Sequence, residues 1–414
     1  MWLYQVGITL LKTGLYASVL FSRKTREFLA GRKGLFRQLK EFSEKRQDEP
    51  CFWFHCASLG EFEQGRPVIE SLKEQYPDAC IIITFFSPSG YNVRKDYKLA
   101  DLVCYLPLDG ALNAQRFMKL VRPTVALFIK YEFWYGYLRA LDRRDIPSIS
   151  VSTLLRPDSA PFRWYGGFYR QMLRLIDHYF VQDELTGKLL ENIGIRSTTL
   201  AGDTRFDRVA ELCHEAKEIE LASVFKQDEK VMVVGSNWPP DTEVLLPFIQ
   251  EFEEQLKFII APHNIEEAHL VRIEEEVPYK TIRYSQAKAN TVSNYRVLLI
   301  DNVGMLTSLY RYGDFAYVGG AFGKSLHNIL EPATYGMPLF FGNRSYQHVR
   351  EATDLLKLKG ATTVNDTKDL RYKFLSIWND EEKQQRIGDI CQHYVQTHTG
   401  ATKKVMSYLE RFLS

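Results

Sequence analysis

The sequence is poor in features that would assign it to a simple class of protein. Its six cysteines show no C-x-x-C spacing, and four lie in or beside apolar, strand-like runs, so we expect buried thiols of a reducing compartment and neither a zinc site nor a disulfide framework. Lysine and arginine number 53 against 51 acidic residues, so no basic excess indicates nucleic-acid binding. Repeats, low-complexity tracts and Asp/His clusters with metal-ligand spacing are also missing, so we expect no essential metal and no cofactor.

The N-terminus has almost no charge. Lys12 is the one charged residue among the first 21, and about 20 apolar residues are the minimum for a helical membrane span. Nothing there resembles a signal peptide. A basic run follows, made of Arg23, Lys24, Arg26, Arg32, Lys33, Arg37 and Lys40. We expect residues 1–22 to form a membrane helix, spanning or interfacial, with the basic run on the cytoplasmic side beside anionic lipid. The alternative is a helix packed on the protein's own core.

What the chain does have is length and a regular alternation of elements. Its 414 residues exceed the size at which single cores stop growing, so two domains are expected. Short apolar runs alternate with helical patterns, pause over the charged segment 203–229, and then resume. This predicts an α/β protein with two doubly wound, Rossmann-like parallel sheets, facing each other across a cleft. Strands are expected at 51–56, 80–85, 103–106, 124–129, 147–151, 178–181, 231–236, 257–262, 296–300, 315–320 and 338–342.

Polar loops at the carboxyl ends of these strands are candidate sites. Glu61 follows the first strand at the start of a helix, where it either complements the helix dipole or serves as a general base. "KYEFWYGY" places Lys130 and Glu132 after the fourth strand, and Arg205 ends the first half. In the second half, the turns at 235–243 and 261–269 have the character of phosphate-binding strand-to-helix turns.

The stretch "KSLHNILEPATYGMPLFFG" (324–342) allows two interpretations. Asn328 as N-cap and Glu331 three residues later form a capping box that would satisfy free N–H groups. Alternatively, the helix start faces a phosphate and Glu331 binds a sugar hydroxyl.

Taken together, these motifs resemble the 3-deoxy-D-manno-octulosonic acid (Kdo) transferases of lipopolysaccharide synthesis, inverting glycosyltransferases with two Rossmann domains (GT-B). "FHCASLGEFEQG" is similar to the family's H-x-x-S-[VL]-G-E, and "LHNILEPATYGMP" to its G-H-N-x-L-E-P-A-x-x-G-x-P. "KYEFW", "GDTRFD", "GSNWPPDTE", "APHN" and "DNVGML" match further family motifs with substitutions. Lys130 replaces a glutamate, Arg205 a lysine, His263 a phosphate-contacting arginine and Met305 a glutamate.

The resemblance implies a set of site residues. Glu61 would be the catalytic base, with Lys130, Glu132 and Arg205 completing the catalytic group. The nucleotide CMP would be held by residues of the second half: Ser236, Pro262, His263, Val303, Gly304, Met305, Asn328, Ile329, Leu330 and Glu331.

The resemblance also implies substrates and a location. CMP-Kdo would be the donor, and the primary hydroxyl of a lipid A precursor (a tetraacyldisaccharide 4'-phosphate) the acceptor. The enzyme would lie on the cytoplasmic side of the inner membrane of a Gram-negative bacterium, in contact with membrane lipid. The expected domains are an anchor at 1–22, an acceptor domain at 23–205 and a nucleotide-sugar domain at 206–414, whose last helix can pack back on the acceptor domain. The alternatives are another GT-B transferase or epimerase, a dinucleotide oxidoreductase, and an inactive, membrane-tethered binding protein.

Overall fold

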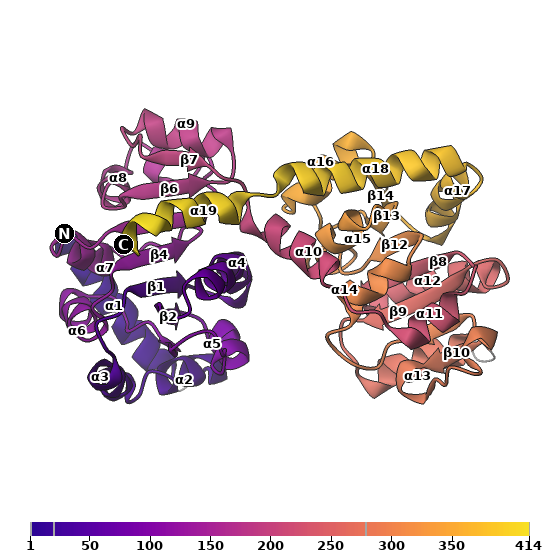
Figure 1. Cartoon of the computed structure of the whole chain (residues 1–414), viewed down its shortest axis with the longest axis horizontal. Helices are drawn as coiled ribbons and strands as arrows, with labels where there is room; N and C mark the ends of the chain where they lie inside the picture. The colour runs from indigo at the N-terminus through magenta and orange to yellow at the C-terminus, as the bar shows by residue number, and fades with distance from the viewer. Residues whose placement is uncertain (1, 20, 278–279, 414) are drawn as a thin grey trace. The chain divides into compact units, whose positions relative to one another are not determined.

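The computed structural model describes residues 2–19, 21–277 and 280–413, and the chain divides into two compact units (Figure 1). The first unit contains Met1–Arg208 together with Thr399–Ser414, and the second contains Val209–His398. The division falls just beyond the expected boundary at residue 205. It also assigns the end of the chain to the first unit.

The first unit is built on a seven-stranded parallel sheet of order β3-β2-β1-β4-β5-β6-β7. Because β1 lies between β2 and β4, the strand order reverses beside β1, and ligands of doubly wound sheets bind at such a point. The strands are β1 Cys51–Cys56, β2 Cys80–Phe85, β3 Leu102–Tyr105, β4 Val125–Ile129, β5 Ser148–Thr153, β6 His178–Val181 and β7 Thr198–Leu200.

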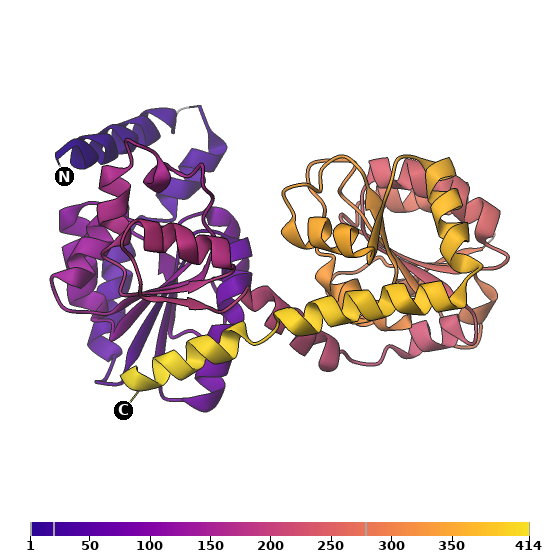
Figure 2. The same ribbon diagram turned by 90° about the horizontal axis from the view of Figure 1, so that it is seen from above.

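Helices cover both faces of this sheet, which explains why its strands are apolar runs without alternation. Trp53 and Phe128 face the helices α3 (Leu35–Lys45), α6 (Ala111–Val121), α7 (Tyr135–Asp142), α8 (Gly167–Leu173) and α9 (Glu184–Asn192). Phe52 and Phe54 face the opposite side, where α4 (Leu59–Gln75) and the last helix, α19 (Ala401–Leu409), pack (Figures 1 and 2). The remaining helix of this unit's body is α5 (Pro88–Arg94).

Two further helices, α1 (Trp2–Ser18) and α2 (Arg23–Ala30), precede this body. No helix within the described part of the chain is both long enough and apolar enough to cross a membrane. Residues 1 and 20 of the expected anchor lie outside the described residues. The prediction that the whole basic run faces lipid is wrong for Arg32. Its side chain turns inward and donates to the carbonyl oxygens of Phe28 (2.8 Å), Phe86 (2.8 Å) and Leu106 (3.1 Å). Arg32 is therefore not a lipid-facing cation.

The second unit repeats the architecture with a seven-stranded parallel sheet of order β10-β11-β9-β8-β12-β13-β14. Here the strand order reverses beside β8. The strands are β8 Val231–Asn237, β9 Lys257–Pro262, β10 Thr281–Arg283, β11 Val297–Leu299, β12 Phe315–Val318, β13 Leu339–Gly342 and β14 Ala361–Val364. The helices are α11 Glu220–Lys226, α12 Pro239–Phe252, α13 Glu267–Glu276, α14 Leu306–Leu309, α15 Leu330–Thr334, α16 Arg350–Leu358, α17 Thr367–Trp378 and α18 Glu381–His398, and α10 (Thr204–His214) precedes them.

The two parallel, doubly wound sheets confirm the predicted fold class of an α/β protein with two Rossmann-like domains. All six cysteines are buried, as predicted, including the two that lie outside the apolar runs.

Candidate functional site

Strained backbone marks the carboxyl ends of central strands in both units. Lys130 directly follows β4 with φ 69°, Ser152 lies near the end of β5 with φ 54°, and Ser236 lies near the end of β8 with φ 53°. Residues with side chains rarely adopt this left-handed conformation, which costs about 1–3 kcal/mol, and such residues cluster at functional sites. The strained residues therefore lie at the strand ends where the sequence predicted candidate site residues, and two of them, Lys130 and Ser236, are themselves predicted site residues.

Glu61 lies in the first turn of α4, directly after β1, and is buried with 9% exposure. Its Oε2 accepts hydrogen bonds from the backbone N–H groups of Ala57 and Ser58 (3.2 Å for Ser58), so the carboxylate does cap the helix. Burial, and then the charge of Glu132, raise its pKa to about 7, although the Ala57 N–H and the Lys130 ammonium act against this. A carboxyl group with this pKa can accept a proton near neutral pH, so capping and base chemistry are compatible here.

Lys130 and Glu132 come from the loop after β4, the strand that neighbours β1. The Lys130 N–H donates to Val151 O (2.8 Å) and its carbonyl accepts from the Ser150 hydroxyl (3.0 Å), which holds the left-handed residue against β5. Burial raises the pKa of Glu132. Since β1 and β4 are adjacent strands, Glu61, Lys130 and Glu132 lie at the same edge of the sheet, where the strand order reverses, and both charges influence the pKa of Glu61.

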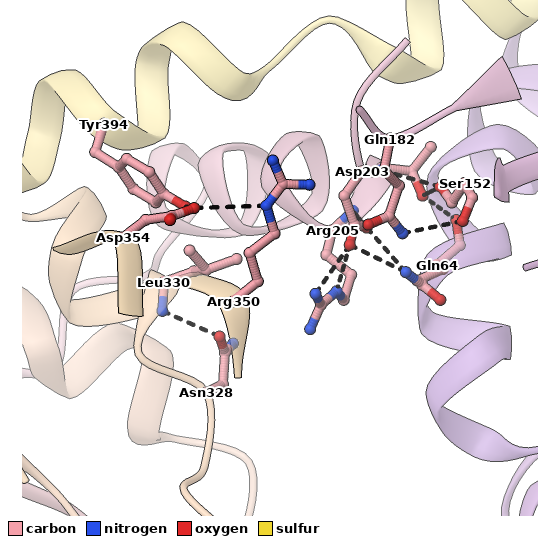
Figure 3. A network of polar contacts seen from close by, with 11 residues as sticks. Gln64, Ser152, Gln182, Asp203, Arg205, Asn328, Leu330, Arg350, Asp354 and Tyr394 are labelled. Carbon is pink, nitrogen blue, oxygen red and sulfur yellow. Dashed lines mark hydrogen bonds and ion pairs between the residues drawn. The ribbon is translucent and has the colours of Figure 1, made fainter. Parts of the chain in front are cut away.

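Arg205 is held by a neighbouring acid (Figure 3). Its Nε and a second guanidinium nitrogen lie 3.0 and 2.9 Å from Asp203 Oδ2. The backbone N–H of Arg205 donates to Asp203 Oδ1 at 3.0 Å. Gln64 of α4 donates to both oxygens of the same carboxylate at 3.1 Å. Burial alone would raise the pKa of Asp203, but Arg205 and Gln64 outweigh it and lower that pKa. Asp203 therefore stays charged and holds Arg205 at the start of α10, although that side chain is 40% exposed.

In the second unit, Asp241 ties together the ends of the two strands that flank the strand-order reversal. Its carboxylate is fully buried and accepts from Trp238 N–H (3.1 Å), Gly320 N–H (2.9 Å) and Tyr317 OH (3.1 Å). Gly320 has φ 96°, and a Cβ there would lie 2.4 Å from Ser325 O. The close approach requires glycine at this turn.

Trp238, His263 and His327 form a cluster of stacked rings at these strand ends. The Trp238 indole N–H donates to His327 Nε2 (2.8 Å), and the two rings are nearly coplanar at 13°. The His263 ring lies against both, with centroids 4.3 Å from Trp238 and 4.4 Å from His327. Burial lowers the pKa of His263, and burial together with His263 lowers that of His327 to about 4. Both imidazoles are therefore neutral at pH 7, and His327 Nε2 acts as an acceptor.

The capping-box interpretation of Asn328 and Glu331 is wrong. The N-cap of α15 is Ile329, and Asn328 Oδ1 accepts instead from Leu330 N–H at 3.1 Å (Figure 3). The Glu331 carboxylate accepts from Asn328 Nδ2 and from the Thr307 hydroxyl, each at 2.9 Å. Burial raises the pKa of Glu331, opposed by these two donors. Glu331 therefore joins α14 to the start of α15, and the side chain that binds an N–H group of the first turn is that of Asn328.

The predicted nucleotide residues thus lie at the carboxyl edge of the second sheet. Ser236 and Pro262 end adjacent strands, His263 joins the ring cluster, and Met305 is the N-cap of α14, which Glu331 contacts through Thr307. Val303 is 81% exposed. The sequence interpretation missed Trp238, Asp241, Thr307 and, in the first unit, Gln64 and Asp203. A tryptophan directly after a strand and before Pro239 was the strongest available signal for the ring cluster.

Comparison with solved structures first identifies the type of fold. The structure of UDP-GlcNAc 2-epimerase from Neisseria meningitidis bound to UDP-GlcNAc is similar over 88% of this chain and 100% of that chain, with a TM-score of 0.60 and 15% identity. At this identity the similarity concerns the fold alone, which is the two-sheet GT-B type. It gives no preference between an epimerase and a transferase.

Sequence relatives then give the particular kind. The family model of 3-deoxy-D-manno-octulosonic-acid transferase (kdotransferase) matches residues 31–208. The 3-deoxy-D-manno-octulosonic acid transferase of Haemophilus influenzae is 26% identical over 87% of this chain and 87% of its own length. That of Chlamydophila psittaci is 26% identical over 74% of this chain and 71% of its own length. The predicted resemblance to the Kdo transferases, and with it the assignment to glycosyltransferases, is confirmed.

Proposed function

We propose that the protein transfers Kdo from CMP-Kdo to the primary hydroxyl of a lipid A precursor, with inversion at the anomeric carbon. The observation that carries this proposal is Glu61, a buried carboxyl group at the strand-order reversal whose pKa is about 7. A base with such a pKa suits the activation of a hydroxyl at neutral pH and typically accounts for about 10²–10⁴-fold in rate. The similarity to Kdo transferases supports the identity of the sugar.

In this mechanism the acceptor hydroxyl attacks the anomeric carbon while its proton passes to a Glu61 oxygen. The bond to CMP breaks with its electron pair, so CMP leaves as the anion and the new glycosidic bond forms on the opposite face. Lys130 supplies positive charge near Glu61 for the carboxylate of the sugar or the developing phosphate charge. Arg205 contributes less positive charge to this stabilisation than Lys130 does, because its guanidinium group is already paired with the carboxylate of Asp203.

We assign the nucleotide to the second unit. Glu331 still has lone pairs for ribose hydroxyls beyond the two bonds it accepts, and the neutral His263 stands where the family has an arginine. A neutral imidazole binds phosphate less strongly than a guanidinium fork, so we expect weaker phosphate binding than in relatives that retain the arginine.

The enzyme acts, in this proposal, at the cytoplasmic face of the inner membrane of a Gram-negative bacterium, attached peripherally through residues 1–22. An interfacial position suits α1, because it has only 17 residues and, while Ile8 packs on the protein, Val6 and Leu10 remain exposed. The acceptor is itself a membrane lipid, which gives the attachment a purpose.

A direct assay tests the proposal against its alternatives. The purified chain is incubated in turn with labelled CMP-Kdo plus lipid A precursor, UDP-GlcNAc alone, and NAD. Formation of Kdo-lipid and CMP only in the first mixture is the expected result. Epimerised UDP-sugar or NADH would replace the proposal with an epimerase or an oxidoreductase, and CMP binding without turnover would indicate an inactive binding protein.

A further inference from the structure

We propose that a second segment of the first unit, the aromatic loop at residues 163–169, joins α1 in docking the protein onto an anionic lipid surface. The loop has the sequence R-W-Y-G-G-F-Y and ends in the first turn of α8. The inference rests on the proposed membrane attachment, and it adds a contact that lies far from residues 1–22 in the sequence.

The first observation is that α1 packs on the protein with one face only. Tyr4 stacks on Phe168 of α8 at 5.2 Å and lies edge-on to Tyr135 at 5.4 Å, and its hydroxyl donates to the carboxylate of Asp109. Ile8, one turn further along, is buried at 8% exposure. In Figure 2, α1 lies on the outside of the unit, with ribbon on one side of it only.

The opposite face of α1 is also apolar but has no partner among the described residues. Leu10 is 67% exposed and Val6 36%, and Phe21 just beyond the helix is 89% exposed. A helix that is apolar on both faces is typical of a buried or membrane-bound position, and here the body of the protein covers one face. The outward face of α1 therefore offers apolar side chains to a surface from outside the chain.

The second observation is the exposure of large aromatic side chains beside α1. Trp164 is 92% exposed, Tyr165 57% and Tyr169 41%, and the two rings of Trp164 and Tyr165 meet edge-on at 5.5 Å. The stack of Tyr4 on Phe168 fixes this loop next to the helix. Tryptophan and tyrosine are the residues that concentrate at membrane–water interfaces, because their rings are apolar while their N–H and O–H groups stay hydrated.

The charge around both segments selects the kind of lipid. Besides the inward-turned Arg32, residues 1–40 contain seven lysines and arginines and one acidic residue, and residues 159–176, between Asp158 and Asp177, contain three arginines. Arg23 and Arg37 keep side-chain exposures of 87% and 83% although each pairs with a glutamate one turn away. Two positively charged segments bordering exposed apolar side chains fit an anionic bilayer surface, where each nearby cation contributes about 1 kcal/mol.

The experiment measures co-sedimentation of the full chain with vesicles of phosphatidylcholine containing about 30% phosphatidylglycerol. The double variant Trp164→Ser/Tyr165→Ser should bind roughly tenfold more weakly, as expected for losing two interfacial aromatic side chains. Tyr372→Ser, which alters a 74% exposed tyrosine of the second unit, should bind like the unaltered protein. Binding by the unaltered protein should weaken on pure phosphatidylcholine.

Three outcomes would overturn the inference. Equal binding by the double variant would leave α1 as the sole contact. Equal binding to neutral and anionic vesicles would remove the charge argument. Loss of Kdo transfer to a detergent-dispersed acceptor in the double variant would assign the loop to acceptor binding. Failure of the transferase proposal itself leaves the vesicle result unaffected, because no substrate is present in that measurement.

Discussion

Replacing Glu61 with glutamine should stabilise the protein at alkaline pH. The folded-state pKa of about 7 lies above the ordinary 4.5, so the fold favours the protonated carboxyl group. Its stabilising contribution is therefore complete below the unfolded-state pKa and is lost as the pH rises through about 7. This difference in pKa corresponds to about 3 kcal/mol well above pH 7. Glutamine resembles the protonated acid and avoids this loss.

Thermal unfolding at pH 4.5 and 8.5 measures the effect. Glu61→Gln should unfold at a higher temperature than the unaltered protein at pH 8.5, by roughly 2–4 °C per kcal/mol, and at nearly the same temperature at pH 4.5. Glu74→Gln, an exposed position on the same helix, should have no effect at either pH. If the carboxylate served only as a helix cap, Glu61→Gln would instead lower stability at pH 8.5 by about 1 kcal/mol.

The same variant should lose activity. We expect kcat to fall by about 10²–10⁴-fold, since the base is removed while the fold is kept. In the unaltered enzyme, the rate should rise with pH to a plateau above about 7, where Glu61 is ionised. Glu132→Gln should move this midpoint to lower pH, because it removes a charge that raises the pKa of Glu61. A less stable Glu61→Gln variant with a near-normal rate would refute both parts of the reasoning.

Three further predictions concern nucleotide binding and attachment. Glu331→Gln should weaken CMP binding about tenfold in calorimetry, because it removes a charged hydrogen-bond acceptor. The control variant Glu275→Gln, at an exposed position, should bind CMP like the unaltered protein. Equal CMP affinities of Glu331→Gln and the unaltered protein would exclude Glu331 from the ribose site. His263→Arg should strengthen CMP binding roughly tenfold, because a permanently charged guanidinium group, which can still stack on Trp238, replaces a neutral imidazole. Weaker CMP binding by this variant would mean that the His263 side chain does not face the phosphate. Deleting residues 1–22 should move the protein from membranes to the soluble fraction while transfer to a detergent-dispersed acceptor persists, and a soluble full-length protein would contradict the attachment.

The sequence predicted the central strands well and the edges poorly, for a physical reason. Strands such as β2 and β9 are enclosed by neighbours and helices, so they form continuous apolar runs that stand out in the sequence. The unpredicted strands β7, β10 and β14 all lie at sheet edges, are three or four residues long and keep partly exposed side chains. Edge strands need little apolar surface, so their sequences resemble loops.

Side-chain partners were harder to predict than site positions. Loops at strand ends follow from the alternation of strands and helices, so the sequence alone could place Glu61 and Lys130 at one edge of a sheet. The bond from Trp238 to His327 spans 89 positions, and no local pattern indicates it. The error at Glu331 has the same origin, because local spacing predicted a backbone cap while the carboxylate binds the side chains of Asn328 and of Thr307, 24 positions earlier.

Backbone strain supports the site independently of family resemblance. Among the described residues with side chains, seven have positive φ. Arg122, Gln227 and Lys359 end helices and Asp145 lies in the turn after α7, where left-handed residues are ordinary. The other three, introduced above at β4, β5 and β8, instead occupy strand ends, where regular backbone would cost nothing. Hydrogen bonds hold two of them, since the Ser150 hydroxyl binds the carbonyl of Lys130 and the Gln182 amide that of Ser152. Strain that recurs at the same edge of two separate sheets is best explained by a shared requirement for ligand binding there.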